Sequence, residues 1–245
     1  MSTRSARYPV LLCDLDGTLV DSLPDLRRAL NKLLCELNLP EQSLQAVRGM
    51  VGNGVAKLVA RGLAAAGGPQ DPNRLADHLE RFLRHYNAGL VIDTRPYPGA
   101  ARVLRALKAE GWRLAVCTNK PEEPSRRILE ALDLLDLFEA IGGGDSFPVR
   151  KPDPGHPLGI LARMGADPAA ATMLGDSRAD AEAARAAGLP SVLVRFGYSP
   201  GTPLEALADR TIDGFEELPA ALREIAAARA AGGRQQPLDS PGALP

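Results

Sequence analysis

The chain has 245 residues, of which 45% are hydrophobic and 24% charged, as is usual for a globular protein. Its formal net charge is −1 and it carries no basic block, so we expect neither nucleic acid nor an anionic membrane surface as a partner. The first apolar run is too short for a signal-peptide core or a membrane span, and three cysteines without metal-ligand spacing favour a reduced, cytoplasmic setting.

Short apolar runs alternate with amphipathic segments along most of the chain. The apolar runs predict buried strands at Val10–Asp14, Arg113–Thr118, Phe138–Gly142, Thr172–Gly175 and Ser191–Val194. The amphipathic segments predict helices at Ala100–Glu110, Pro124–Leu132, Pro157–Met164 and Ala179–Ala187. This alternation predicts an α/β fold, a three-layer Rossmann-like core with a parallel sheet, built from residues 1–19 and 96–228.

Residues 20–95 interrupt this pattern with a different one. They hold no strand signal and three amphipathic runs, at Leu23–Leu37, Val55–Ala66 and Leu75–Tyr86. An insertion of that size predicts an all-helical lobe of its own, which leaves the core just after the first strand. The composition of residues 229–245 predicts a disordered tail.

Polar residues collect where the predicted strands end. They are Asp14, Asp16 and Gly17 after the first strand, Thr118 and Asn119 after the second, Lys151 on a loop between prolines, and Asp176 with Asp180 after the fourth. Each group has a simpler interpretation. Asp-Gly is a common turn pair, and Thr118 could cap a helix. Lys151 could be a solvated charge on a loop, and Asp176 and Asp180 could simply stabilise a helix N-terminus electrostatically.

The joint occurrence of these groups at successive strand ends indicates one site, because parallel strands open into a crevice at their carboxyl ends. Two acid clusters form the hard oxygen site that suits Mg²⁺, which keeps waters and substrate oxygens as its other ligands. A hydroxyl, backbone amides and a lysine are donors for a phosphate group. Together these residue types predict phosphoryl transfer.

The four segments resemble, in order, the four motifs of the haloacid dehalogenase superfamily, and the helical insertion resembles its helical cap. Within the superfamily the chain is most similar to the phosphoglycolate phosphatases. That narrower likeness rests on the segments Arg48–Gly54, Tyr97–Gly99, Thr118–Lys120 and Gly142–Asp145. One departure is Ala179, where these phosphatases usually carry Asn, although Asp180 is retained.

The resemblance implies a role for each motif residue. Asp14 is the expected nucleophile, forming an aspartyl-phosphate, and Asp16 the expected acid and base. The expected Mg²⁺ ligands are Asp14, Asp16 through its carbonyl, and Asp176, with Asp180 in support. Expected substrate-binding residues are Gly17, Thr118, Asn119 and Lys151. Because the core residues reach only the phosphoryl group and the metal, a residue of the cap is expected to read the rest of the substrate. Arg48 is the candidate to meet a substrate carboxylate, and the alternative is that its segment is only a turn and the arginine is solvated.

The expected function is Mg²⁺-dependent hydrolysis of a small phosphate monoester, first of all 2-phosphoglycolate to glycolate and phosphate. A phosphatase for a sugar phosphate or for pyrophosphate remains an alternative, as does a β-phosphoglucomutase-like mutase, which shares every core motif. A dehalogenase would lack the second aspartate, so Asp16 argues against it. A catalytically dead phosphate-binding regulator would be expected to have lost one of Asp14, Asp16, Lys151 and Asp176. None of these residues is missing. The chain is expected to act as a monomer or homodimer.

Overall fold

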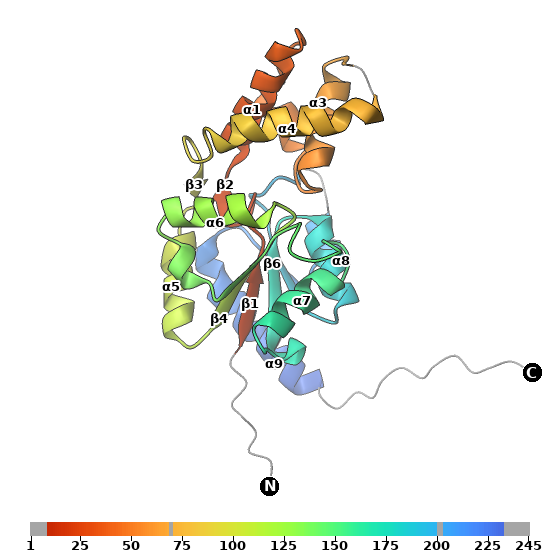
Figure 1. Ribbon diagram of the computed structural model, residues 1–245. Coiled ribbons are helices and arrows are strands. Elements are labelled where there is room, and N and C mark those ends of the chain that lie inside the picture. The colour runs from red at the N-terminus through yellow and green to blue at the C-terminus, as the bar shows by residue number, and fades with distance from the viewer. Residues whose placement is uncertain (1–8, 69–70, 200–202, 233–245) are drawn as a thin grey trace, which may run out of the picture.

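A six-stranded parallel sheet forms the core of the protein. The computed structural model describes residues 9–68, 71–199 and 203–232, and Figure 1 shows the sheet between two layers of helices. The strands are β1 (Val10–Cys13), β4 (Arg113–Cys117), β5 (Ala140–Gly142), β6 (Ala171–Gly175), β7 (Ser191–Val194) and β8 (Arg210–Ile212), in the spatial order β5-β4-β1-β6-β7-β8. The helices of the core are α5 (Ala100–Ala109), α6 (Glu122–Ala131), α7 (Gly155–Arg163), α8 (Arg178–Ala186) and α9 (Leu218–Gly232). The predicted three-layer α/β fold is confirmed.

The strands are continuous apolar runs because both faces of the sheet are covered. Along β1, Leu11 and Cys13 join the cluster that includes residues of α5 and α9, whereas Val10 and Leu12 join the cluster with α7. This alternation follows from the period of two residues in an extended strand. All four side chains of β1 are fully buried, so the strand is fixed at the centre of the sheet.

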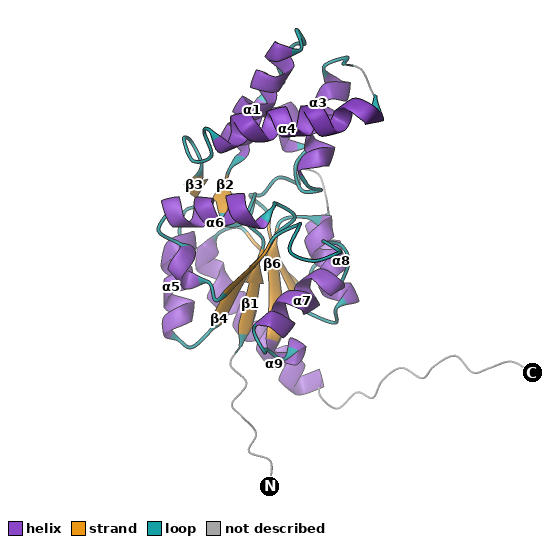
Figure 2. Ribbon diagram, in the orientation of Figure 1, coloured by secondary structure: helices purple, strands orange, loops and turns teal. Residues whose placement is uncertain are grey.

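The inserted residues form a helical lobe, the cap (residues 20–95), at one end of the sheet (Figure 2). Its helices are α1 (Leu23–Glu36), α2 (Leu44–Arg48), α3 (Val55–Ala65) and α4 (Leu75–Asn87). The apolar stripe of α1 is buried, and Leu30 on that stripe packs against Gly62 of α3 so closely that a Cβ at Gly62 would lie 2.6 Å from it. The small residue therefore lets the two helices approach.

Short elements depart from the sequence expectations. The cap, expected to lack strands, is bounded by the antiparallel pair β2 (Val20–Asp21) and β3 (Arg95–Pro96), which are too short to show a period. The helix α9 reaches Gly232, so residues 229–232 are helical instead of part of a tail, because this alanine-rich run has high helix propensity. The rest of the expected tail, residues 233–245, lies outside the described residues. Among the described helices, none is long and apolar enough to cross a membrane.

The strand order determines where in the fold the expected site lies. The chain runs outward from β1 to β4 and β5, then returns to β6 on the other side of β1. In doubly wound sheets this switch point opens a crevice at the carboxyl ends of the strands, where ligands bind. The cap lies above that end of the sheet (Figure 1). Segments far apart in the sequence therefore meet between core and cap.

Candidate active site

Three aspartates meet at the switch point. Asp14 directly follows β1, and Asp176 directly follows β6, its neighbour in the sheet. Together with Asp180 on α8 they bring carboxylate oxygens within 4.8 Å of one another. Gly17 allows this approach, because its φ is +87° and a Cβ there would lie 2.6 Å from the Oδ2 atom of Asp176. Gly17 thus shapes the chain around the acids.

Lys151 lies among these carboxylates. Its Nζ atom is 2.8 Å from Oδ1 of Asp14 and 2.6 Å from Oδ1 of Asp180, and it donates to the carbonyl oxygen of Cys117 at 2.6 Å. Burial alone would lower the pKa of Lys151, but the charges of Asp14 and Asp180 raise it above its usual range. The side chain is therefore a buried, permanent cation whose three donors all meet protein oxygens.

Asp180 is held on all sides by the protein. While Oδ1 accepts from Lys151, Oδ2 accepts the N–H of Asp176 at 3.2 Å and the N–H of Ser177 at 3.0 Å. Ser177 and Asp180 form a capping box at the start of α8. Asp180 thus caps the N-terminus of α8 and also binds Lys151 of the site. Both of its oxygens are engaged, so it supports the site by orienting Lys151 and the loop of Asp176.

The three acids of this cluster carry more negative charge than the single ammonium of Lys151 can neutralise. Burial raises the pKa of Asp14 to about 6, an effect that Lys151 opposes and the neighbouring acids reinforce. Burial, with the charges of Asp180 and Asp14, also raises the pKa of Asp176 well above its usual range. Buried carboxylates in excess of their cation favour either a proton or a further cation. The donor set, all carboxylate oxygen, fits a hard divalent metal ion.

Asp16 points away from this cluster, toward the cap. Its carboxylate accepts from the hydroxyl of Ser22 and pairs with Lys120, whose Nζ atom is 3.0 Å from both carboxylate oxygens. Two acids two residues apart in the chain therefore have separate cations, Lys151 for Asp14 and Lys120 for Asp16. This separation allows them to have different chemical roles.

Thr118 and Asn119 follow β4, next to β1, and both line the pocket beside Asp14. The Thr118 hydroxyl accepts the N–H of Lys120 at 3.2 Å. The Asn119 side chain donates to the carbonyl of Lys151 at 3.0 Å and to that of Gly52, in the cap, at 3.1 Å. Its backbone N–H has no partner in the described part of the chain, so it is available to a ligand.

Arg48 is not brought into this pocket. Its guanidinium donates to the carbonyl of Phe196 at 3.2 Å and to that of Gly197, both on the loop after β7. This arginine therefore joins the cap to the core. Among the described residues, those that line the pocket do not include it.

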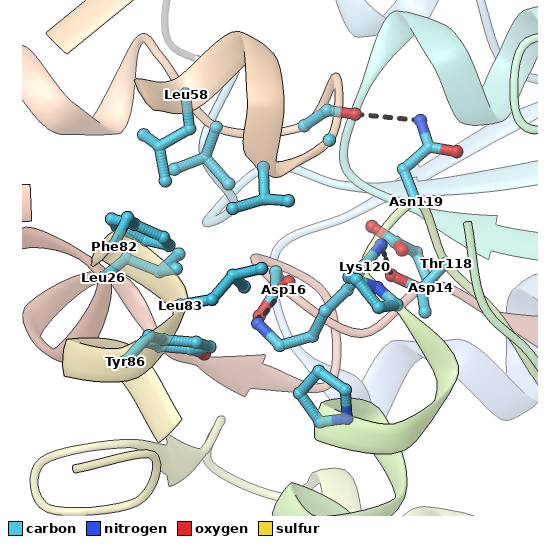
Figure 3. A pocket seen from close by; sticks show the side chains of 16 residues that line it. Asp14, Asp16, Leu26, Leu58, Phe82, Leu83, Tyr86, Thr118, Asn119 and Lys120 are labelled. Carbon is cyan, nitrogen blue, oxygen red and sulfur yellow. Dashed lines mark hydrogen bonds and ion pairs between the residues drawn. The ribbon is translucent and has the colours of Figure 1, made fainter. Parts of the chain in front are cut away.

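The pocket between core and cap has one polar and one apolar side (Figure 3). The core contributes Asp14, Asp16, Thr118, Asn119 and Lys120. The cap contributes mainly aliphatic and aromatic side chains, namely Leu26, Val51, Val55, Leu58, Phe82, Leu83 and Tyr86. Figure 3 shows Phe82 and Tyr86 on the side that faces Lys120. A phosphate bound at the polar side would therefore place the rest of a substrate against the cap.

Sequence reasoning assigned no role to Lys120, Tyr86 or Tyr198. The Tyr198 hydroxyl accepts the N–H groups of Ser22 and Leu23 and lies 2.8 Å from Asp21, while its own N–H donates to Asp176 at 2.6 Å. Tyr198 thereby links the base of the cap with the acid cluster. The Thr118–Lys120 segment, which carries part of the family likeness, points to Lys120 in the sequence. Its partner could not be predicted, because Asp16 lies 104 residues earlier in the chain.

His156 supports the loop after β5. Its Nε2 atom is 3.0 Å from the carbonyl oxygen of Gly143, and its ring meets the edge of Phe147. Burial, together with the charge of Lys151, lowers the pKa of His156 to about 4. The imidazole is therefore neutral at physiological pH and serves packing.

Comparisons with known proteins agree with this geometry. Residues 8–188 match the haloacid dehalogenase-like hydrolase family. The chain is 43% identical over 219 residues to a phosphoglycolate phosphatase of Cereibacter sphaeroides, covering 89% of this chain and 100% of that one. It is 45% identical over 209 residues to a phosphoglycolate phosphatase of Caulobacter vibrioides, covering 85% and 88% of the two chains.

Solved structures give the same result. A predicted phosphoglycolate phosphatase from Haemophilus somnus superposes with a TM-score of 0.82 at 33% identity, over 87% of this chain and 97% of that one. CbbY from Rhodobacter sphaeroides, in complex with phosphate, superposes with a TM-score of 0.77 at 27% identity, over 88% and 99%. A match of this extent confirms the expected family: the chain belongs to the haloacid dehalogenase-like hydrolases and is a phosphoric monoester hydrolase.

Proposed function

We propose that the protein is a Mg²⁺-dependent phosphatase that hydrolyses 2-phosphoglycolate to glycolate and phosphate through an aspartyl-phosphate. The observation that carries the proposal is the pair of aspartates with separate cations, Asp14 beside Lys151 and Asp16 beside Lys120, in one pocket under the cap. The named relatives from Cereibacter and Caulobacter support the choice of substrate.

Asp14, Asp176 and the backbone carbonyl of Asp16 would hold the Mg²⁺ ion. The raised pKa values of Asp14 and Asp176 support this assignment, because buried carboxylates in excess of their ammonium partner are stabilised by a divalent cation. When bound, the ion offsets the negative charge of the phosphoryl group so that a carboxylate can approach it. Asp180, whose oxygens are engaged by the protein, would orient Lys151 and the Asp176 loop.

In the first step an Asp14 carboxylate oxygen attacks phosphorus and the bond from phosphorus to the ester oxygen breaks. Asp16 acts as the acid of this step and gives a proton to the departing alkoxide, so that glycolate leaves. Lys151 keeps Asp14 oriented and supplies fixed positive charge as the phosphoryl group is transferred. The Thr118 hydroxyl and the free N–H of Asn119 bind the phosphoryl oxygens.

In the second step water attacks phosphorus and the bond from phosphorus to Asp14 breaks. Asp16, now a carboxylate, takes the proton of the attacking water and returns to its starting state. One residue serves both steps because water attacks from the side that the leaving group vacated. Ser22 and Lys120 hold the Asp16 carboxylate in place for both proton transfers.

Phosphate release from a panel of small phosphate monoesters tests this proposal. We expect 2-phosphoglycolate to give the highest kcat/KM, EDTA to abolish turnover and added Mg²⁺ to restore it. Rapid quenching during turnover should trap a phosphoryl group on Asp14 in the wild type and none in the Asp14→Asn variant. Equal activity in EDTA and in Mg²⁺ would refute the metal assignment, and a phosphoryl group on another residue would refute the nucleophile.

A further inference from the structure

Away from Asp14, the pocket presents one ammonium group, that of Lys120, which is paired with Asp16. Among the described lining residues the only charged side chains are Asp14, Asp16 and Lys120. Lys120 is 7% exposed, and the charge of Asp16, with a contribution from Tyr86, raises its pKa above the usual range although burial acts in the opposite direction. The pocket therefore keeps an ammonium group where the organic part of a substrate would lie.

This ammonium has bonding capacity left for a ligand. It contacts the two oxygens of Asp16 at 3.0 Å, and a lysine has three N–H donors. The ring of Tyr86 in the cap lies beside it, with the Nζ atom 4.7 Å from the ring centroid. Lys120 from the core and Tyr86 from the cap thus meet at one point of the pocket, as Figure 3 shows.

Tyr86 adds a second unused donor. It is 3% exposed and lines the pocket, yet its hydroxyl has no hydrogen-bond partner among the described residues. Burial raises the pKa of Tyr86, so the hydroxyl keeps its proton. A buried polar group without a partner costs free energy, and a ligand that accepts from it removes that cost.

The cap side of the pocket is mainly apolar. The cap contributes mainly side chains such as Leu58, Phe82 and Leu83, which offer no hydrogen bonds to sugar hydroxyls. An apolar wall also strengthens the attraction between an ammonium and an anion, because it keeps water away. The chemistry of this region therefore matches one compact anionic group.

We propose that Lys120 and Tyr86 together bind the carboxylate of the substrate, so that the enzyme selects phosphate monoesters whose leaving group carries a carboxylate next to the ester carbon. This inference rests on the proposed function and deepens it. Asp16 serves the ester oxygen in that function, and Lys120 touches Asp16, so a carboxylate one carbon from that oxygen falls beside the ammonium. Lys120 takes the place expected for Arg48, which is bound to the loop after β7.

A pair of matched substrates tests the inference. Ethyl phosphate has the same ester linkage as 2-phosphoglycolate but carries a smaller, uncharged methyl group in place of the carboxylate. We define the preference as kcat/KM for 2-phosphoglycolate divided by kcat/KM for ethyl phosphate, measured in Mg²⁺. An effect of Lys120 through Asp16 acts on both substrates, whereas loss of a contact with the carboxylate acts on 2-phosphoglycolate alone. A fall in this ratio therefore reports mainly carboxylate recognition.

The variants are Lys120→Met, Lys120→Arg and Tyr86→Phe, with Lys57→Met, an exposed lysine on α3, as the matched control. Loss of a charged hydrogen bond to the carboxylate should lower the preference roughly 10- to 100-fold in Lys120→Met. Lys120→Arg should keep a larger preference than Lys120→Met. Tyr86→Phe should lower it roughly 2- to 10-fold. The control should match the wild type.

Binding of unreactive analogues supplies a second readout. The inhibition constants of 3-phosphonopropionate and propylphosphonate, which differ in the same carboxylate, should converge in Lys120→Met and in Tyr86→Phe. An unchanged preference in these variants, together with unchanged inhibition constants, overturns the carboxylate site. If Lys120→Met does not fold, Lys120→Arg and Tyr86→Phe decide the question. A wild type that shows no preference for 2-phosphoglycolate would instead refute the proposed function.

Discussion

Replacing Asp14 by Asn should stabilise the metal-free protein while it removes activity. Burial raises the pKa of Asp14 from 3.8 to about 6, so the folded state disfavours the ionised carboxyl. The shift is about two pKa units, and at about 1.4 kcal/mol per unit it corresponds to about 3 kcal/mol at pH 7. For a chain of this length that gain raises the Tm by roughly 6–12 °C.

The sign of the pH dependence follows from the same shift. A carboxyl with a raised pKa in the folded state costs nothing while it is protonated in both states, below about pH 4. The cost grows as pH rises toward about 6 and is constant above that value. The stability gain of Asp14→Asn should therefore be absent near pH 4 and complete at pH 7.

Thermal melts in EDTA between pH 4 and pH 8 measure this effect, with Asp136→Asn on the exposed surface as the matched control. Added Mg²⁺ should raise the Tm of the wild type and reduce the advantage of the variant, because the ion favours the ionised carboxyl. A variant that melts at or below the wild-type temperature at pH 7 in EDTA would refute the reasoning. So would a gain that is equal at pH 4 and pH 7.

Two further substitutions test the ammonium beside Asp14 and the contact between cap and core. Lys151→Ala should lower kcat/KM roughly 100- to 1000-fold and reduce the free energy of unfolding by about 3–5 kcal/mol, because it removes the ammonium partner of Asp14 and Asp180. Kinetics and urea denaturation close to those of the wild type would show that this lysine has only a minor role. Arg48→Ala should reduce turnover of 2-phosphoglycolate and of ethyl phosphate by similar factors, since it loosens the contact between the cap and the loop after β7. A loss confined to 2-phosphoglycolate would instead restore the carboxylate role expected from the sequence.

The sheet and the longer helices could be predicted because local sequence determines them. The strands β1, β4, β6 and β7 are buried on both faces, so each is an apolar run that stands out from its flanks. The edge strand β8 is three residues long with an exposed first residue, and β2 and β3 have two residues each, so none shows a period. The helix α9 was missed because its alanines and charges give only a weak apolar stripe.

Within the site, the sequence could predict the residues that follow strands but not the partners they find. Asp14, Thr118, Lys151 and Asp176 lie together because the strand order of a parallel sheet brings loop ends to one edge. The pairing of Asp16 with Lys120 joins two core loops that lie 104 residues apart in the chain, and the contact of Lys120 with Tyr86 depends on how the cap sits on the core. No local pattern encodes either contact. The contact of Arg48 with the loop after β7 likewise depends on the docking of cap and core.

The way in which the cap is attached has a consequence for how such enzymes diversify. Its two chain connections run side by side, since Val20 pairs with Pro96 and Asp21 with Arg95. Near the same base, the buried carboxylate of Asp25 accepts the N–H groups of Ile92 and Thr94 and ties both ends of the insertion together. The two covalent connections between the insertion and the core therefore form one narrow, two-stranded link. A replacement lobe of another shape would leave the sheet continuous, so the cap side of the pocket can change by exchange of a single module.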